Sequence, residues 1–97
     1  MKNQRYITLK TICESHDITE SFVISLSEFE LIEVVEDNRE KKIAESQLTD
    51  LEKFIRISND LDVNVAGIEV IHRLTKKMER MQREMELLEK RLEIYEP

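Results

Sequence analysis

The side chains in this sequence that could carry out catalysis are few and dispersed. His16 and His72 lie in different segments of the chain, and the single cysteine, Cys13, has no second thiol for a disulfide or a metal cluster. Acids such as Glu28 and Glu30 could act as a general acid and base, but an exposed acidic surface lacks the burial that tunes such groups. The sequence therefore predicts no enzyme and no cofactor, and we expect His72 to be a solvated or interface residue.

Oxygen-bearing side chains cluster between Asn59 and Asn64, where a metal loop is one interpretation. Asp60 and Asp62 could supply carboxylate ligands, but the glycine and the closing glutamate of a calcium loop are missing. The one glycine of the chain, Gly67, also leaves no glycine-rich loop for phosphate. We interpret the segment as a connector between two helices and expect no bound metal.

Charge is distributed unevenly along the chain, whose net charge is −6. Between Thr11 and Asn38 there is no Lys or Arg. The acids of this stretch are Glu14, Asp17, Glu20, Glu28, Glu30, Glu33, Glu36 and Asp37. An acidic surface of this kind repels phosphate backbones and attracts basic protein surfaces. No apolar run approaches the roughly 20 residues of a membrane span, and the start of the chain has no apolar signal region, so we expect a cytoplasmic protein.

The N-terminal third predicts two short helices joined by a tight turn. The first covers residues 9–15, and the second begins after Thr19, which is a suitable N-cap because Glu20 then places an acid in the first turn. An apolar stripe follows helical spacing in the second helix: Phe22, Val23, Leu26 and Phe29. Polar residues and Ile24 are expected on its other side. Together these segments predict a helix–turn–helix.

A hairpin and a third helix are predicted next. The β-branched run at residues 31–35, the turn at 36–39 and the segment 41–44 indicate a two-stranded wing. Ser46 is the expected N-cap of a helix from Gln47 to about Asp60. The apolar stripe of this helix contains Leu48, Leu51, Phe54, Ile55, Ser58 and Leu61.

An unbroken heptad pattern marks the C-terminal third. Its apolar positions recur at alternating spacings of three and four residues from Ile71 to Tyr95. We expect the interface of a homodimer to contain Ile71, Leu74, Met78, Met81, Met85, Leu88 and Leu92. A helix starting near Val65 would be roughly 45 Å long, and the preceding residues could cover only its first turns. The pattern leaves open whether two such helices run parallel or antiparallel.

The order of these elements resembles the MerR-like winged-helix architecture. The resemblance covers residues 18–32, the hairpin, and Ser46-Gln47-Leu48. It implies a mostly α fold with two parts. Residues 1–64 form a winged helix–turn–helix with a small β-hairpin wing, and residues 65–97 form a long coiled-coil dimerisation helix.

A closer resemblance is to the chaperone-modulator (CbpM) family, and it extends from Ile7 nearly to the C-terminus. Its points of similarity are the acidic helix–turn–helix, the run LIEVV at residues 31–35, and the run LDVNVAGI at residues 61–68. The resemblance implies a protein that binds the J domain of a DnaJ-like (CbpA-type) co-chaperone and inhibits it. We expect the acidic face to bind this partner through Asp17, Glu20, Ser21, Ile24, Ser25 and Glu28.

A DNA-binding transcription regulator of the MerR type is the alternative. Its support is the scaffold, a dimer able to place two modules on neighbouring half-sites, and the wing cations Arg39, Lys41 and Lys42. MerR-type regulators read DNA with an Arg and a pair of Tyr residues in the second helix, where this chain has residues 24–26, Ile-Ser-Leu. The missing cations argue against nucleic acid as the partner.

Overall fold

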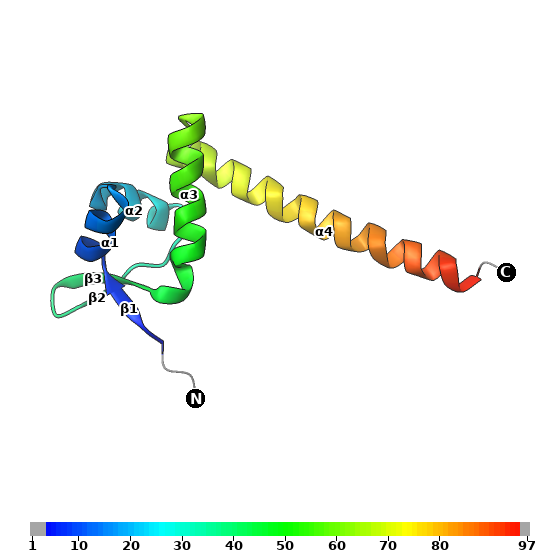
Figure 1. The fold of residues 1–97 in the computed structure, drawn as a ribbon, viewed down its shortest axis with the longest axis horizontal. Helices are drawn as coiled ribbons and strands as arrows, with labels where there is room; N and C mark the ends of the chain where they lie inside the picture. The colour runs from blue at the N-terminus through cyan, green and yellow to red at the C-terminus, as the bar shows by residue number, and fades with distance from the viewer. Residues whose placement is uncertain (1–3, 96–97) are drawn as a thin grey trace.

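Short helices pack beside a small sheet, and one long helix leaves them (Figure 1). The structure is a computed structural model and describes residues 4–95. Its elements are, in chain order, β1 (Tyr6–Thr8), α1 (Leu9–His16), α2 (Glu20–Glu28), β2 (Val35–Asp37), β3 (Glu40–Ala44), the 3-10 turn η1 (Glu45–Gln47), α3 (Leu48–Leu61) and α4 (Val65–Tyr95). The predicted fold class, mostly helical with a small antiparallel sheet and a long C-terminal helix, is therefore confirmed.

Capping residues set the ends of the helix–turn–helix, and the predicted cap at Thr19 is confirmed. Thr19 is the N-cap of α2, and its Oγ1 accepts a hydrogen bond from the backbone N–H of Phe22 at 3.1 Å. Thr8 caps α1 in the same way, with Oγ1 accepting from the N–H of Thr11 at 3.2 Å. Asp17 follows the last turn of α1 in the left-handed conformation, with φ 55°, and this lets the chain turn towards α2.

The wing has three strands rather than the predicted two. β1 pairs antiparallel with β3, placing Ile7 opposite Ile43, and β2 pairs with the other edge of β3, so that the strand order is β1-β3-β2. β1 contains only three residues, which is too short for an alternating pattern to be visible in the sequence. β2 begins at Val35 and not at residue 31, as the β-branched run suggested.

Residues 30–34 connect α2 to β2 instead of forming a strand. Glu30 has a left-handed backbone with φ 62°, and the N–H of Leu31 donates to the carbonyl of Leu26 at 2.9 Å. The side chain of Gln47 then bonds both backbone groups of Glu33, accepting from its N–H at 2.8 Å and donating to its carbonyl at 2.9 Å. These bonds take the place of strand pairing in this segment.

Ser46 is not the N-cap that the sequence suggested. It lies inside η1, and its hydroxyl accepts a hydrogen bond from the side chain of Gln4 at 2.9 Å. α3 starts at Leu48, and no side chain caps it. The 3-10 turn leads directly into the helix, so that the chain enters α3 without the extended residue that a capping serine requires. At its other end α3 continues to Leu61, one residue beyond the prediction, and Asp62 ends it in the left-handed conformation.

Two members of the predicted apolar stripes are exposed because they lie at helix ends. Phe29 follows the last residue of α2 and is 42 % exposed, and Leu61 ends α3 and is 62 % exposed. The interior positions of both stripes behave as predicted, since they supply much of the core. The buried core contains Leu9, Ile12, Val23, Leu26, Ile32, Ile43, Leu51, Phe54 and Ile68.

The first turns of α4 belong to this core. Ile68 is fully buried, and the ring of His72 contacts Phe54 edge to face, with ring centroids 5.3 Å apart. Val65, where the second unit was expected to begin, is thus the start of a helix whose first turns pack on the N-terminal body. The outermost residues of the two expected units, 1–3 and 96–97, lie outside the described residues.

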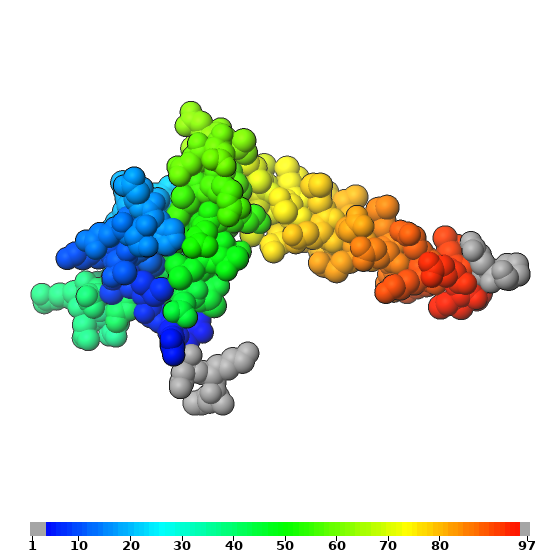
Figure 2. All heavy atoms as spheres, viewed as in Figure 1, coloured from blue at the N-terminus to red at the C-terminus, as the bar shows by residue number. Residues whose placement is uncertain are grey.

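The rest of α4 projects away from the body and makes the molecule elongated, with extents of 64 × 40 × 21 Å. On the face that Figure 2 shows, atoms of the body lie against only the start of this helix. Within residues 4–95, no helix is both long enough and apolar enough to cross a membrane.

Gly67 gives a test of how tightly α4 is attached to the connector before it. A Cβ added at Gly67 would overlap Cγ1 of Val63, and the β-branched Val63 side chain has little freedom to move. We expect Gly67→Ala to lower the free energy of unfolding by about 1 kcal/mol, because overpacking exceeds the gain in helix propensity. In a Val63→Ala background the overlap is removed, so that the same change should raise stability.

Urea unfolding of the parent, Gly67→Ala, Val63→Ala and the double mutant, all at the same protein concentration, measures this coupling. A Gly67→Ala protein as stable as the parent would contradict the close approach. The absence of any coupling between the two positions would contradict it equally.

Candidate functional site

The residues predicted to bind a partner lie along one side of α2 and the turn before it. Glu20, Ser21 and Glu28 are exposed, and their spacing places them on one face of the helix together with position 24. Asp17 is exposed at the turn that precedes α2. We call the set Asp17, Glu20, Ser21, Ile24, Ser25 and Glu28 the α2 face.

Two members of the α2 face are less open than the sequence suggested. Ile24 is half-buried and packs against the core. Ser25 is also half-buried and lines a hollow of about 430 Å³ beside Phe22 and Phe29. The open part of the α2 face is therefore mainly acidic and hydroxylic.

In the part of the chain that the structure describes, the acids of the α2 face form no ion pairs with neighbouring cations. Across residues 4–95 the ion pairs are His16–Glu52, Lys42–Asp37, Arg73–Glu69 and Lys76–Glu79. None of them involves Asp17, Glu20 or Glu28, and α2 itself carries no Lys or Arg. A helix in the position that reads DNA in a helix–turn–helix thus carries acids and no cation of its own.

Cations gather beside the Glu20 end of the α2 face, where the wing meets the start of α1. Lys10, Arg39 and Lys41 line a hollow of about 360 Å³ there, together with the acids Glu20 and Glu40. Arg39 lies in the turn of the wing with φ 65°. Sequence reasoning identified the wing cations but missed Lys10, because the pairing of β1 with β3 is what brings the start of α1 beside them.

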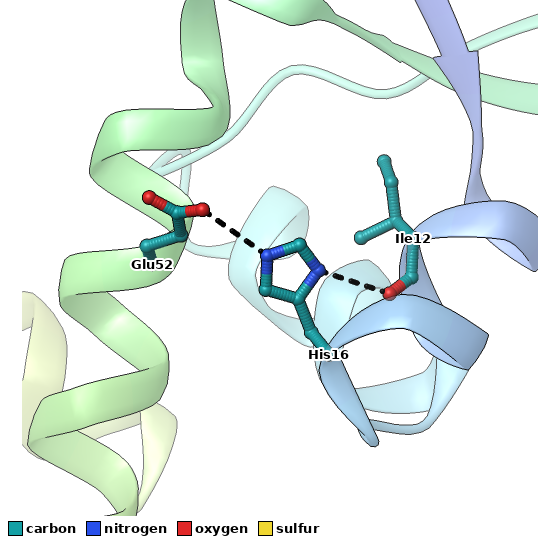
Figure 3. Close-up of polar contacts among 3 residues, drawn as sticks. All are labelled: Ile12, His16 and Glu52. Atoms are coloured by element: carbon teal, nitrogen blue, oxygen red, sulfur yellow. Dashed lines mark hydrogen bonds and ion pairs between the residues drawn. The ribbon is translucent and has the colours of Figure 1, made fainter.

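Both histidines have structural surroundings. His16 connects two helices: its Nδ1 is 3.2 Å from the carbonyl oxygen of Ile12 in α1, and its Nε2 is 3.2 Å from a carboxylate oxygen of Glu52 in α3 (Figure 3). His72 is half-buried, and its ring packs on Phe54 of the core, so that it is less solvated than the sequence suggested. Its Nδ1 is buried without a hydrogen-bond partner among the described atoms.

The remaining candidates for chemistry are also separated in space. Burial, and then the charges of Glu20 and Glu14, raise the pKa of the Cys13 thiol, which keeps it protonated and weakly nucleophilic. In the connector before α4, Asn64 Oδ1 accepts from the N–H of Gly67 at 2.9 Å, as a helix cap does. The described part of the chain contains no group of three His, Cys, Asp or Glu side chains that could hold a metal ion.

A second open surface runs along α4. Ile71 is half-buried next to the body, while all later apolar heptad positions up to residue 92 are more than half exposed. These positions are Leu74, Met78, Met81, Met85, Leu88 and Leu92. A continuous apolar row of this length on one chain is typical of an interaction surface.

The comparisons with known proteins agree with this architecture. Residues 7–90 match the family model described as MerR HTH family regulatory protein. No curated protein and no solved structure matches the chain. The match includes the helix–turn–helix, the wing, α3 and most of α4, and the chain therefore belongs to the MerR HTH family.

Proposed function

We propose that this protein is a chaperone modulator, which binds the J domain of a DnaJ-like co-chaperone through the α2 face and inhibits it. The observation that carries the proposal is the helix in the reading position, which has unpaired acids and no cation. Phosphate would be repelled by this surface, whereas a basic protein helix would be attracted to it. J domains present such a basic helix to their DnaK partners, so that capture of this helix would block the productive contact.

Reversal of charge on the α2 face tests this mechanism. We expect Glu20→Lys with Glu28→Lys to weaken binding of a cognate J domain by about tenfold or more, because attraction is replaced by repulsion. Binding of the unaltered protein should also weaken between about 50 and 500 mM NaCl, since exposed charges are screened. Calorimetric titration measures both effects, and the J-domain-stimulated ATPase of DnaK reports inhibition.

Glu86→Lys with Glu93→Lys is the matched control, because it makes the same change of charge on exposed positions of α4, outside the heptad row and far from α2. An equal loss of J-domain binding in the two double mutants would mean that only the net charge of the protein matters. An unaltered protein that binds no J domain, or binds it without salt dependence, would remove the proposal.

DNA binding is the second candidate function, and the basic hollow at the wing favours it. Lys10, Arg39 and Lys41 could contact phosphate groups while the dimer spans two half-sites. The family description, a regulatory protein, is compatible with this function as well. In this alternative the acidic α2 would have to stand away from the phosphate backbone.

A gel-shift assay on random duplex DNA at low salt separates the two functions. Even non-specific DNA binders associate under these conditions when their cations face the phosphates. Because the reading helix is acidic, we expect this protein to give no shift at micromolar concentration. A clear shift that is lost in Arg39→Glu with Lys41→Glu would instead support DNA binding through the wing.

We propose in addition that the protein acts as a homodimer formed by the exposed row on α4. In an antiparallel pair with Met78 opposite the partner's Met81, Lys77 would lie beside the partner's Glu84, an attractive contact that occurs twice. In a parallel pair Glu84 would lie beside the partner's Glu89, which is repulsive. The flanking charges thus favour the antiparallel arrangement.

Two charges placed in the middle of the row should separate the subunits. We expect Met81→Glu with Met85→Glu to give monomers in analytical ultracentrifugation, because each buried Met contributes roughly 1.5–3 kcal/mol. The body should remain folded, since neither residue contacts the core. A double mutant with the mass of a dimer would show that the helix associates through another surface.

A further inference from the structure

We propose that the groove between α2 and the junction of α3 with α4 is a docking site for a basic amphipathic helix. This proposal rests on the proposed function, since it assigns the place where the partner's helix is buried. Two adjoining hollows form the groove and share Phe22 and Ser58. One opens toward the turn before α2, beside Asp17 and Ile18, and the other toward the start of α4.

The floor of the groove is apolar and incompletely covered. Phe29 is 42 % exposed, and Phe22 and Val65 are half-buried. Two of the three phenylalanines of the chain thus face this groove, while the third, Phe54, is fully buried. Partly open aromatic rings in a concave surface are the usual anchors of a protein contact.

The groove stays accessible in a dimer formed through the α4 row. Successive residues of a helix are turned by roughly 100°. Val65 and Ala66, which line the groove, therefore point roughly 160° away from the mean direction of Ile71 and Leu74. A second copy on the heptad row would lie on the other side of α4, so that each dimer would carry two open grooves.

The charge around the groove selects the sign of its occupant. Among the described residues, no Lys or Arg lines either hollow, while Asp17 lines one of them. Glu28, Asp60 and Asp62 are exposed and adjoin lining residues in the sequence, and so does one cation, Arg56, so that acids predominate. An occupant that buries apolar side chains on this floor would have its flanking positions beside these acids, and lysine or arginine there would be favoured.

The walls of the groove select the shape of its occupant. They come from α2, α3 and the start of α4 and offer no strand edge that an extended peptide could pair with. Phe22, Ser25 and Phe29 form a row spaced three and four residues apart, about 10 Å long. A helix of two to three turns with apolar residues at the same spacing fits such a row.

Model peptides and one groove variant test the proposal. The probe is a fluorescent helical peptide of Leu and Lys, with Leu at i, i+3, i+4 and i+7, and its counterpart carries Glu in place of every Lys. Ala66→Arg places bulk and positive charge in the groove at an exposed helical position. Ser15→Arg is the matched control, because it adds the same side chain to an exposed helical position outside the groove.

We expect the Lys peptide to bind the parent and Ser15→Arg with equal affinity, and to bind Ala66→Arg at least about tenfold more weakly. The Glu peptide should bind none of these proteins. Phe29→Ala, which removes an anchor without adding charge, should also weaken binding. Equal binding to the parent and Ala66→Arg, or equal binding of both peptides, would overturn the groove. So would a change in sedimentation caused by Ala66→Arg, since the groove would then be a contact between copies.

The J domain is titrated against the same proteins to separate this proposal from the proposed function. Equal binding to the parent and Ala66→Arg would keep J-domain capture and overturn the groove. If the J domain binds none of the proteins, the proposed function fails, and the peptide titrations alone decide the groove. Loss of both peptide and J-domain binding in Ala66→Arg, with Ser15→Arg unaffected, supports both.

Discussion

The packing of Ile68 and His72 against α3 is the contact on which the rest of the molecule depends. A chain of 97 residues can build only a small core, and this one includes a residue from the first turns of α4. The long helix is thereby fixed to the body instead of being attached by a loose linker. The edge-to-face contact between His72 and Phe54 extends the same junction by one more turn. Whatever associates with α4 is therefore held at a defined orientation to the helix–turn–helix.

Two kinds of surface are kept apart by this arrangement. Negative charge dominates α2 and the turn before it, and apolar residues dominate one row of α4. Because the body covers only the start of α4 (Figures 1 and 2), the apolar row could be buried by a partner that leaves α2 exposed. Exposure of this row to water carries a free-energy cost, which burial against an apolar partner surface would remove.

Much of the fold could be predicted from the sequence because its signals are local. Thr19 predicts the start of α2 because its hydroxyl caps the helix, and the heptad pattern predicts α4 over many residues. β1 could not be predicted, since its pairing with β3 is a long-range contact of three residues. Ser46 was wrongly predicted to be an N-cap, because the sequence does not show that a 3-10 turn precedes α3 and includes this serine. At the candidate site, the absence of cations from α2 was visible in the sequence, but the packing of Ile24 against the core and the approach of Lys10 to the wing depend on tertiary structure.

The connections between elements use the left-handed backbone conformation without glycine. Asp17, Glu30, Asn38, Arg39 and Asp62 all have positive φ values between 51° and 65°. Asparagine and aspartate tolerate this conformation, but for glutamate and arginine it costs roughly 1–2 kcal/mol. Glycine at Glu30 or Arg39 would therefore be expected to stabilise the fold, because it adopts this backbone conformation without the steric cost. Such substitutions could offset destabilising changes on α2, so that the surface of this helix could vary while the scaffold stays folded.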